Sequence, residues 1–425
     1  MTAMRLRSLL LAALVVAALA SPAGCAREDG TSEQAEPSRP VPAGIAGYRA
    51  VYSVAGRSFY AVALGQGDPE VLLNADGPVG VSMFVAWVPE RSELLFETAE
   101  EGRKDLWAFR EGGEPRLLAR DVRGTIGVSG SDVLYATRGA QAALLARDLD
   151  GGEPRTLLSG EVLGQVSSSP FAPLCFAVRT EDPRGQALYL VEPGSLEPER
   201  IAAVGGARSF GPSFAREGRV TYVELEPGGG AFGRTRYWER GAGGSVDLAA
   251  EGSLLDMSGD GSVLLRRNLR GGVSGVQRSL VSYVPSGDAP ERVVRQELGA
   301  FVGAVHAAAF VADDKVLLSQ RIEGRNRLEL HDLGARESRL LDEDPAMHVS
   351  AIWPLPEADG AVCVRSRPGA ESEGGDGEAP SLVTLEDEIV WVPFAPDAEP
   401  VPIASTTAGS LRFLGVFAPA GASGE

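Results

Sequence analysis

Gly112-Gly113-Glu114-Pro115-Arg116-Leu117-Leu118 is followed by a close copy, Gly151-Gly152-Glu153-Pro154-Arg155-Thr156-Leu157-Leu158. Looser versions of the same stretch stand at 68–73, 197–201 and 289–294. Glycine and proline favour a tight turn, and the apolar residues that follow them favour a strand. The chain therefore repeats one short unit, in which a turn leads into a strand.

The repeat has a nearly constant length. Apolar strands that follow Gly- or Asp-containing turns place equivalent residues 44, 39, 42, 45, 43, 53 and 46 positions apart, at Ala50, Leu94, Val133, Cys175, Val220, Val263, Val316 and Val362. This spacing is typical of a four-stranded blade. The sequence therefore predicts an all-β fold, a β-propeller over 46–420 with eight blades, or with seven if the fifth or sixth unit is a long insertion.

The two ends of the repeat region complement each other. The first unit opens near Tyr48 directly in a second strand, without an innermost strand of its own. The last unit is followed by Ser410–Pro419, whose Phe417 matches the aromatic residue of earlier innermost strands, such as Trp87. We expect this C-terminal strand to complete the first blade and to close the ring, because closure leaves no open sheet edge.

The unit as a whole, with its Asp/Gly turn, apolar strand, further strand and Gly-Gly-Glu-Pro-Arg-x-Leu-Leu ending, resembles the TolB-type, WD-like propeller repeats of bacterial exported proteins. The resemblance extends over about 46–420 and implies an exported propeller. Similar repeats form the propeller of prolyl-oligopeptidase-like peptidases. The Gly-x-Ser-x-Gly motif of a nucleophilic hydrolase does not occur in this sequence.

The N-terminal residues predict export. Arg5 and Arg7 precede the apolar run Leu9–Ala20, which is shorter than the roughly 20 residues of a membrane-spanning helix, and we assign 1–24 as a signal peptide. Cys25 follows small residues and resembles the bacterial lipobox, which implies lipidation of Cys25, a disordered linker over 25–45 and a lipid-anchored protein on the periplasmic side of the cell envelope. Pro22 stands where the lipobox favours Leu, and cleavage after Ala20 would instead release a soluble, secreted protein.

The charge of the chain restricts its partners. The formal net charge is −18, and an acidic surface repels nucleic acid, so no nucleic-acid partner is expected. Beyond Cys25, the cysteines Cys175 and Cys363 stand in apolar strand runs, where we expect them to be buried free thiols.

A few polar residues are candidates for binding at the central funnel. His306 and His348 lie on or near the innermost strands of adjacent units, whereas His331 follows a third strand on the outer side of its blade. Three arginines near the starts of innermost strands could hold an anionic ligand or form ordinary salt bridges in loops. The candidate funnel-binding residues are Arg123, Arg208, His306, His348 and Arg412.

The sequence indicates no catalytic residue, metal site or cofactor, since the acidic run Asp342-Glu343-Asp344 lacks the pattern of a calcium-binding loop. We therefore expect a non-enzymatic lipoprotein whose propeller is a scaffold that binds a protein, peptide or glycan, and whose lipid anchor binds a membrane. The alternative is a propeller enzyme, similar to lactonases or cyclotransferases, with its site in the central funnel. Only His306 and His348 are candidates for that site.

Overall fold

The structure, a computed structural model, describes residues 47–418 except 55–57, 65, 75–82, 101, 167–174, 182–184, 193–194, 207, 217, 228–232, 270–277, 285–295, 299–304, 369–383 and 407–410. Apart from loops and the short 3₁₀ helices η2 (Pro89–Arg91), η3 (Gly139–Gln141) and η5 (Pro356–Ala358), these residues form β-strands. Within this part of the chain, no helix has the length and apolar content needed to cross a membrane. The predicted signal peptide, Cys25 and the predicted linker lie outside the described residues.

Six of the sheets are four-stranded antiparallel blades. In order from the innermost strand outwards, the first three are β31 (Leu411–Phe417), β1 (Arg49–Val54), β2 (Ser58–Ala63) and β3 (Gln66–Asn74); β4 (Met83–Val88), β5 (Glu93–Glu100), β6 (Arg103–Arg110) and β7 (Arg116–Ala119); and β8 (Val122–Ser129), β9 (Asp132–Thr137), β10 (Ala143–Asp148) and β11 (Arg155–Ser159). The other three are β12 (Val162–Val166), β13 (Cys175–Glu181), β14 (Gly185–Val191) and β15 (Glu199–Val204); β23 (Val305–Ala312), β24 (Lys315–Ile322), β25 (Arg325–Asp332) and β26 (Glu337–Asp344); and β27 (His348–Leu355), β28 (Gly360–Pro368), β29 (Thr384–Pro393) and β30 (Val401–Thr406).

One further sheet has seven strands: β16 (Ser209–Arg216), β17 (Arg219–Leu225), β18 (Gly233–Glu239), β19 (Ser245–Met257), β20 (Val263–Leu269), β21 (Arg278–Val284) and β22 (Gln296–Leu298). The all-β propeller is confirmed, but the prediction of eight or seven four-stranded blades is wrong, because the described residues form six such blades and this larger sheet. The reason is the long strand β19. Its first part, beginning at Ser245, pairs with β18, and its last part, ending at Met257, pairs with β20. Hydrogen bonding passes through this strand, so no sheet boundary separates the fifth unit from the sixth.

The repeated turn lies where the sequence places it in the second and third blades. Gly112 and Gly151 adopt positive φ angles of 75° and 118°, which glycine reaches without strain, and the outer strands β7 and β11 begin at the arginine that follows each proline. The looser copy at 68–73 is different, because it lies inside β3 and forms no turn. The copy at 289–294 lies outside the described residues.

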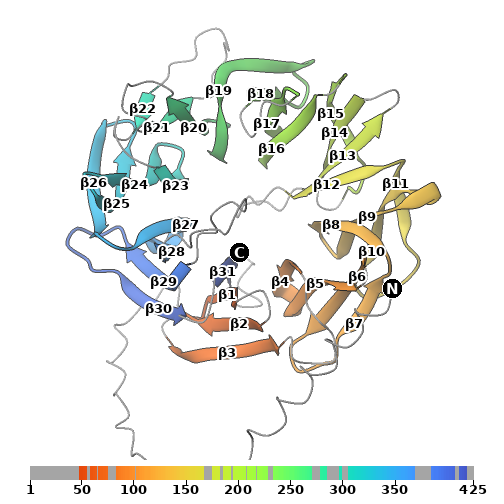
Figure 1. Cartoon of the computed structure of the whole chain (residues 1–425), viewed down its shortest axis with the longest axis horizontal. Coiled ribbons are helices and arrows are strands. Elements are labelled where there is room, and N and C mark those ends of the chain that lie inside the picture. The colour runs from red at the N-terminus through yellow and green to blue at the C-terminus, as the bar shows by residue number, and fades with distance from the viewer. Residues whose placement is uncertain are drawn as a thin grey trace, which may run out of the picture. The chain divides into compact units, whose positions relative to one another are not determined.

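The sheets are arranged in a ring with their innermost strands around its centre (Figure 1). A buried apolar cluster fills each boundary between neighbouring sheets; Leu106 and Tyr135, for example, join the second blade to the third. The boundary between β27–β30 and the first blade is filled in the same way by Trp391 and Tyr52. Burial of large apolar side chains is the main favourable term that holds blade to blade.

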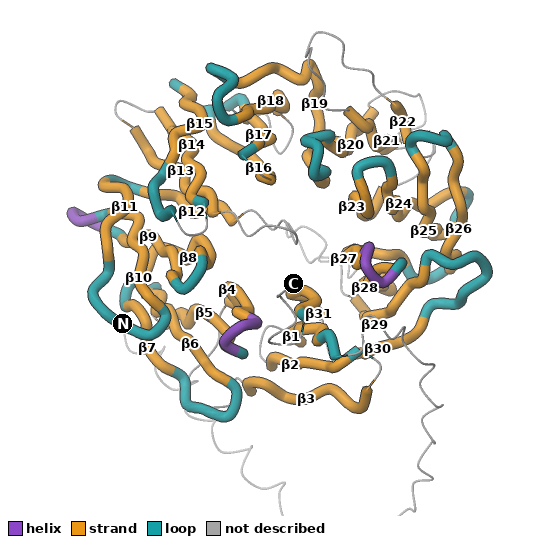
Figure 2. The backbone as a smooth tube through the Cα atoms, turned by 180° about the vertical axis from the view of Figure 1, so that it is seen from behind, coloured by secondary structure: helices purple, strands orange, loops and turns teal. Residues whose placement is uncertain are grey.

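The C-terminal strand closes the ring as predicted. β31 pairs antiparallel with β1, with Val416 opposite Ala50, and β1 pairs on its other side with β2. Figure 2 shows β31 and β1 side by side at the inner end of this blade. Phe417 packs near Trp87, with ring centroids 6.5 Å apart, as an aromatic residue of an innermost strand should.

Buried carboxylates add polar links between neighbouring sheets. Glu97 accepts a hydrogen bond of 2.7 Å from the backbone N–H of Thr125, which joins β5 to β8. Asp256 on β19 accepts one of 2.7 Å from Phe310 on β23. Asp387 on β29 accepts one of 2.6 Å from Leu411 on β31. Each carboxylate satisfies an N–H group that would otherwise be buried without a partner.

Of the two predicted thiols, Cys363 is fully buried and free, and burial raises the pKa of its thiol well above the ordinary value. The side chain of Cys175 lies outside the described residues, although its backbone belongs to β13.

Candidate functional site

The two faces of the ring carry different connections. We call the side on which innermost strands begin, as at Val122 and His348, the strand-start face, and the opposite side, which carries the Gly-Gly-Glu-Pro-Arg turns, the turn face. Because successive strands are antiparallel, the hairpin between the second and third strands of a blade also lies on the strand-start face. Residues from this hairpin and from the connection between one blade and the next can therefore meet there.

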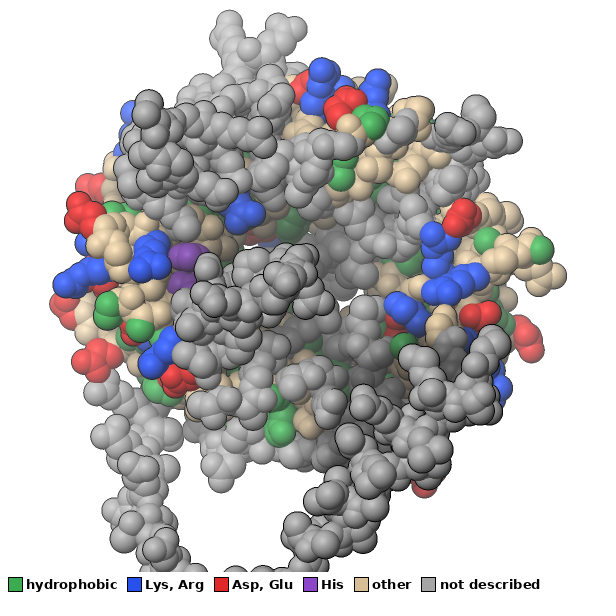
Figure 3. All heavy atoms as spheres, viewed as in Figure 1, with side chains coloured by type: hydrophobic (Ala, Val, Ile, Leu, Met, Phe, Trp, Pro, Cys, Tyr) green, Lys and Arg blue, Asp and Glu red, His purple; other side chains and the backbone are tan. Residues whose placement is uncertain are grey.

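His306 and His348 meet on the strand-start face. His306 is the second residue of β23 and His348 the first residue of β27, and their ring centroids are 4.3 Å apart with an angle of 36° between the planes. Nε2 of His306 is buried and has no hydrogen-bond partner among the described residues. In Figure 3, purple histidine atoms are visible in the left half of the viewed face, next to blue atoms of Lys or Arg.

The surroundings hold both imidazoles in the neutral form. Burial, then His348, then Arg321 lower the pKa of His306 to about 4; a hydrogen bond with Asn326 opposes this, and Arg266 adds to it. Burial also lowers the pKa of His348, where Asp387 and a hydrogen bond to the backbone of Ser366 oppose the shift and Arg321 adds to it. Each charged form would be desolvated and would face a guanidinium.

Arg321 is an exposed cation that lowers the pKa of both histidines. It stands at the end of β24, in the hairpin that leads to β25, and it forms no ion pair within the part of the chain that the structure describes. Arg266, on β20, is half-buried, and its Nε has no hydrogen-bond partner among those same residues. We define the His-pair cluster as His306, His348, Arg321, Arg266 and Asp387.

The three predicted arginines contribute less. Arg123, on β8, forms an ion pair with Glu161, and Arg208 lies 3.7 Å from Glu226. Both side chains therefore fit the alternative interpretation of salt bridges in loops, and neither joins the His-pair cluster. The side chain of Arg412 lies outside the described residues. His331 is also apart, since its Nε2 lies 3.3 Å from Glu329 on the same strand.

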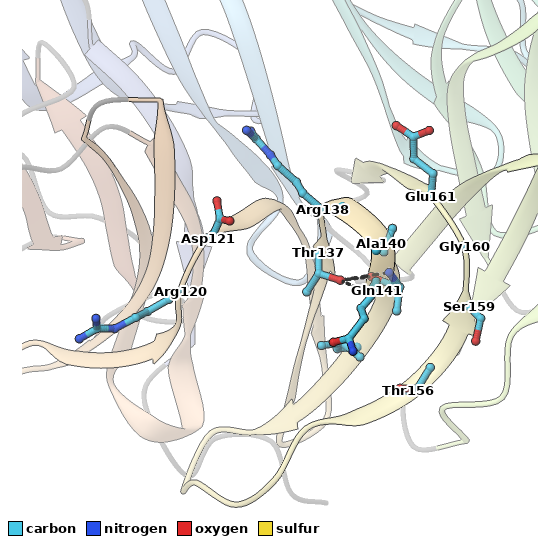
Figure 4. A pocket seen from close by; sticks show the side chains of 14 residues that line it. Arg120, Asp121, Thr137, Arg138, Ala140, Gln141, Thr156, Ser159, Gly160 and Glu161 are labelled. Atoms are coloured by element: carbon cyan, nitrogen blue, oxygen red, sulfur yellow. Dashed lines mark hydrogen bonds between the residues drawn. The ribbon is translucent and has the colours of Figure 1, made fainter.

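A pocket of about 790 Å³ opens on the strand-start face at the third blade. Its lining comes from the approach to β8, the β9–η3–β10 hairpin and the end of β11, and includes both charges and neutral polar groups: Arg120, Asp121, Thr137, Arg138, Gln141, Thr156, Ser159 and Glu161. Figure 4 shows Gln141 between Thr137 and the segment that carries Thr156 and Ser159, with Arg120 directed away from them. The Thr137 hydroxyl donates to the carbonyl of Gln141 at 3.1 Å, which fixes the hairpin turn.

Among the described residues, no three His, Cys, Asp or Glu side chains are placed to hold a metal ion. The acidic run at 342–344 is engaged within the protein: Glu343 bonds to Arg325 and Arg327, and Asp344 accepts backbone hydrogen bonds from Ala346 and Met347. Asp387 is engaged through one oxygen, Oδ2, which accepts the N–H of Leu411, whereas its buried Oδ1 has no hydrogen-bond partner among the described residues. What the His-pair cluster offers is a pair of hydrogen-bonding imidazoles with cationic side chains beside them.

Arg321, Arg266 and Asp387 were not predicted as site residues from the sequence. A signal for Arg321 was present, because an arginine at the end of a second strand lies on the same face as the start of the next innermost strand. Arg266 and Asp387 have no such local signal. They stand within regular strands, and only the packing of three sheets brings them toward the histidines.

No protein-family model and no curated protein matches the chain. Solved structures resemble it: the β-propeller domain of the Trilobed protease from Pyrococcus furiosus is 13% identical, with a TM-score of 0.42 over 76% of this chain and 97% of that one. The putative TolB from Agrobacterium tumefaciens is 12% identical, with a TM-score of 0.35 over 62% and 84%. Oligopeptidase B from Trypanosoma brucei is 11% identical, with a TM-score of 0.45 over 83% of this chain and 53% of that enzyme.

The chain thus spans about half the length of the oligopeptidase. The structural neighbours include TolB proteins and peptidases that carry propellers, and at these identities the similarity concerns the β-propeller fold and not the function.

Proposed function

We propose that the protein is a non-enzymatic binding propeller, anchored to the cell envelope through a lipid on Cys25, that binds a protein or peptide at the strand-start face. The observation that supports this most strongly is the pocket of about 790 Å³, whose walls offer amide, hydroxyl, guanidinium and carboxylate groups. Such groups suit the donors and acceptors of a polypeptide segment. None of the described lining residues is aromatic, which favours a peptide over a glycan that would stack on rings.

Site-specific photo-crosslinking tests the binding face. A photoreactive residue in place of Gln141 is expected to form an adduct with a partner in cells that produce the anchored protein, because Gln141 is exposed and lines the pocket. The same residue in place of Glu153, which is exposed on the turn face, is the matched control and should form no adduct. The measurement is the mass shift of the protein after irradiation.

A second change makes the test specific to the pocket. Ser159→Arg adds a long side chain to the pocket wall without touching the buried core, since Ser159 is exposed. We expect it to abolish the adduct at position 141. An adduct that survives this change, or that forms equally well at position 153, would show that the pocket is not the binding site.

The proposed anchor is tested by the intact mass and the membrane partitioning of the protein, compared with a Cys25→Ala variant. We expect the mature protein to begin at Cys25, to carry acyl chains and to remain with membranes, because each buried methylene adds about 0.8 kcal/mol to membrane binding. The variant should be soluble. A wild-type protein that begins at Ser21 and is already soluble would contradict the anchor and favour secretion.

A further inference from the structure

We infer that the His-pair cluster binds an oxyanion, the carboxylate or phosphate group of a ligand, and takes up a proton when it does so. The inference rests on the proposed function, because it names one chemical group of the ligand that would bind at the strand-start face. It is carried by the position of His306 and His348, whose tilted rings have centroids 4.3 Å apart on the strand-start face, and by Arg321, whose charge acts on both of them.

The positive charges and unpaired donors of the His-pair cluster would be more favourable with an anion bound than without one. Two imidazoles and two guanidiniums approach one another on a chain whose net charge is −18, and Arg321 and Arg266 both lower the pKa of His306. Within the described part of the chain, Arg321 has no carboxylate partner, and Nε2 of His306 accepts or donates no hydrogen bond. An oxyanion would supply acceptors for these groups and would neutralise their mutual repulsion.

Among the described residues, Asp387 is the carboxylate whose charge raises the pKa of His348, and it does not fill this role. Asp387 interacts with His348 and raises its pKa, but one of its oxygens accepts the backbone N–H of Leu411 at 2.6 Å and the residue is buried in β29. Its charge therefore supports the link between β29 and β31. Arg321, on the other hand, is exposed and can turn toward an incoming ligand.

Proton uptake follows from the same contacts. The burial and the cations that disfavour an imidazolium in the free protein would be offset by a bound anion, so the anion raises the pKa of the pair. By linkage, affinity must rise as the pH falls toward the free pKa of about 4. Uptake of one proton corresponds to roughly tenfold tighter binding for each pH unit between the raised pKa of the bound state and the pKa of about 4 that His306 has in the free protein.

Histidine NMR tests this inference directly, because the chain has only three histidines. The full-length mature protein is titrated from pH 7.5 to 3.5, which passes through the pKa of about 4 of His306, at constant ionic strength, with sodium chloride, with inorganic phosphate or with acetate. We expect phosphate, acetate or both to raise the titration midpoints of His306 and His348 by about one unit or more. His331, which pairs with Glu329, serves as the internal reference and should not move.

Matched arginine variants separate the site from general charge effects. Arg321→Gln should weaken anion binding about tenfold or more, since a charge-assisted contact is lost. Arg325→Gln removes the same charge from the same hairpin, but from a side chain that bonds to Glu343 at 2.8 Å, and should bind as the wild type does. A shift with phosphate alone identifies a phosphate group as the ligand chemistry, whereas a shift with acetate as well identifies a carboxylate.

Two results would overturn the inference: midpoints of His306 and His348 that move no more than that of His331, or equal anion binding by the Arg321→Gln and Arg325→Gln variants. If the crosslink at position 141 persists in either case, the proposal of an oxyanion site is wrong, but the proposal that a partner binds at the strand-start face is retained. If that crosslink is lacking as well, the proposed function is also wrong.

Discussion

Gly360→Ala is expected to lower the free energy of unfolding by about 3 kcal/mol, the upper part of the range for overpacking a core. A Cβ atom at this position would stand 2.1 Å from Cζ2 and 2.3 Å from Cη2 of Trp391. The indole cannot move aside, because it is 1% exposed and packs between the last blade and the first. The damage should therefore fall on the boundary at which the ring closes.

Chemical denaturation measures this effect, and Gly124→Ala is the matched control. Gly124 also lies in a strand, β8, but a Cβ atom there would meet nothing within 4 Å. This control should leave stability unchanged or raise it by about 0.4 to 1 kcal/mol, because alanine reduces the entropy of the unfolded chain. Equal stability of the two variants would contradict the packing of Trp391 against Gly360.

Asp256→Asn is expected to change how stability depends on pH, with a variant that becomes less stable than the wild type as the pH falls. Asp256 is buried, and it accepts backbone hydrogen bonds from Phe310 at 2.7 Å and from Met257 at 2.8 Å. Burial raises the pKa of this carboxyl from 3.8 to about 6, against the effect of these two hydrogen bonds and of Arg216. The folded protein therefore holds this proton more tightly than the unfolded chain does.

The direction follows from that difference. A raised pKa contributes stability that is complete below pH 3.8 and is lost as the pH rises through about 6, in total about 3 kcal/mol at 1.36 kcal/mol for each pKa unit. Asparagine cannot titrate, so it lacks this gain in acid. Its amide nitrogen also faces one of the two backbone N–H groups, which costs about 1 to 3 kcal/mol at every pH.

The difference in unfolding free energy between wild type and Asp256→Asn should thus grow by about 2.5 kcal/mol between pH 7 and pH 4, because the gain is not yet complete at pH 4. His306→Gln provides a control of opposite sign. The pKa of His306 is lowered from 6.5 to about 4, so the wild type loses stability from this group as the pH falls through that window, and the variant should be relatively more stable in acid. Denaturation at pH 4, 5, 6 and 7 measures both, and a constant difference for Asp256→Asn would contradict its burial as a carboxylate.

The repeat of the propeller was predictable because its signals are local. Each tight turn contains Gly, Asp or Pro. The eight equivalent residues that define the repeat, from Ala50 to Val362, all lie in the strand that follows the innermost position of their unit. The closing strand was also predictable, because the first unit lacks a strand that 410–419 can supply, and β31 pairs with β1. The number of four-stranded blades could not be predicted. It depends on whether β19 is one continuous strand, whose first part, from Ser245, pairs with β18 and whose last part, up to Met257, pairs with β20.

Some residues of the candidate site could also be predicted from the sequence, whereas their contacts could not. His306 and His348 could be selected from the sequence, because equivalent positions in consecutive units lie side by side in a ring. Arg123 could be selected too, but its ion pair with Glu161 involves a residue of the next unit and was decided by the packing of the third blade against the fourth.

By itself, the sequence determined the all-β class, the length of the repeat, the turns and the pairing of the last strand with the first, because backbone preferences and apolar periodicity act over a few residues. Tertiary structure alone decided where one sheet ends and another begins, which arginine is neutralised and which faces the histidines. It also decided that Asp256 and Asp387 are buried acceptors, since the pKa and the hydrogen bonds of such a group depend on neighbours from other sheets.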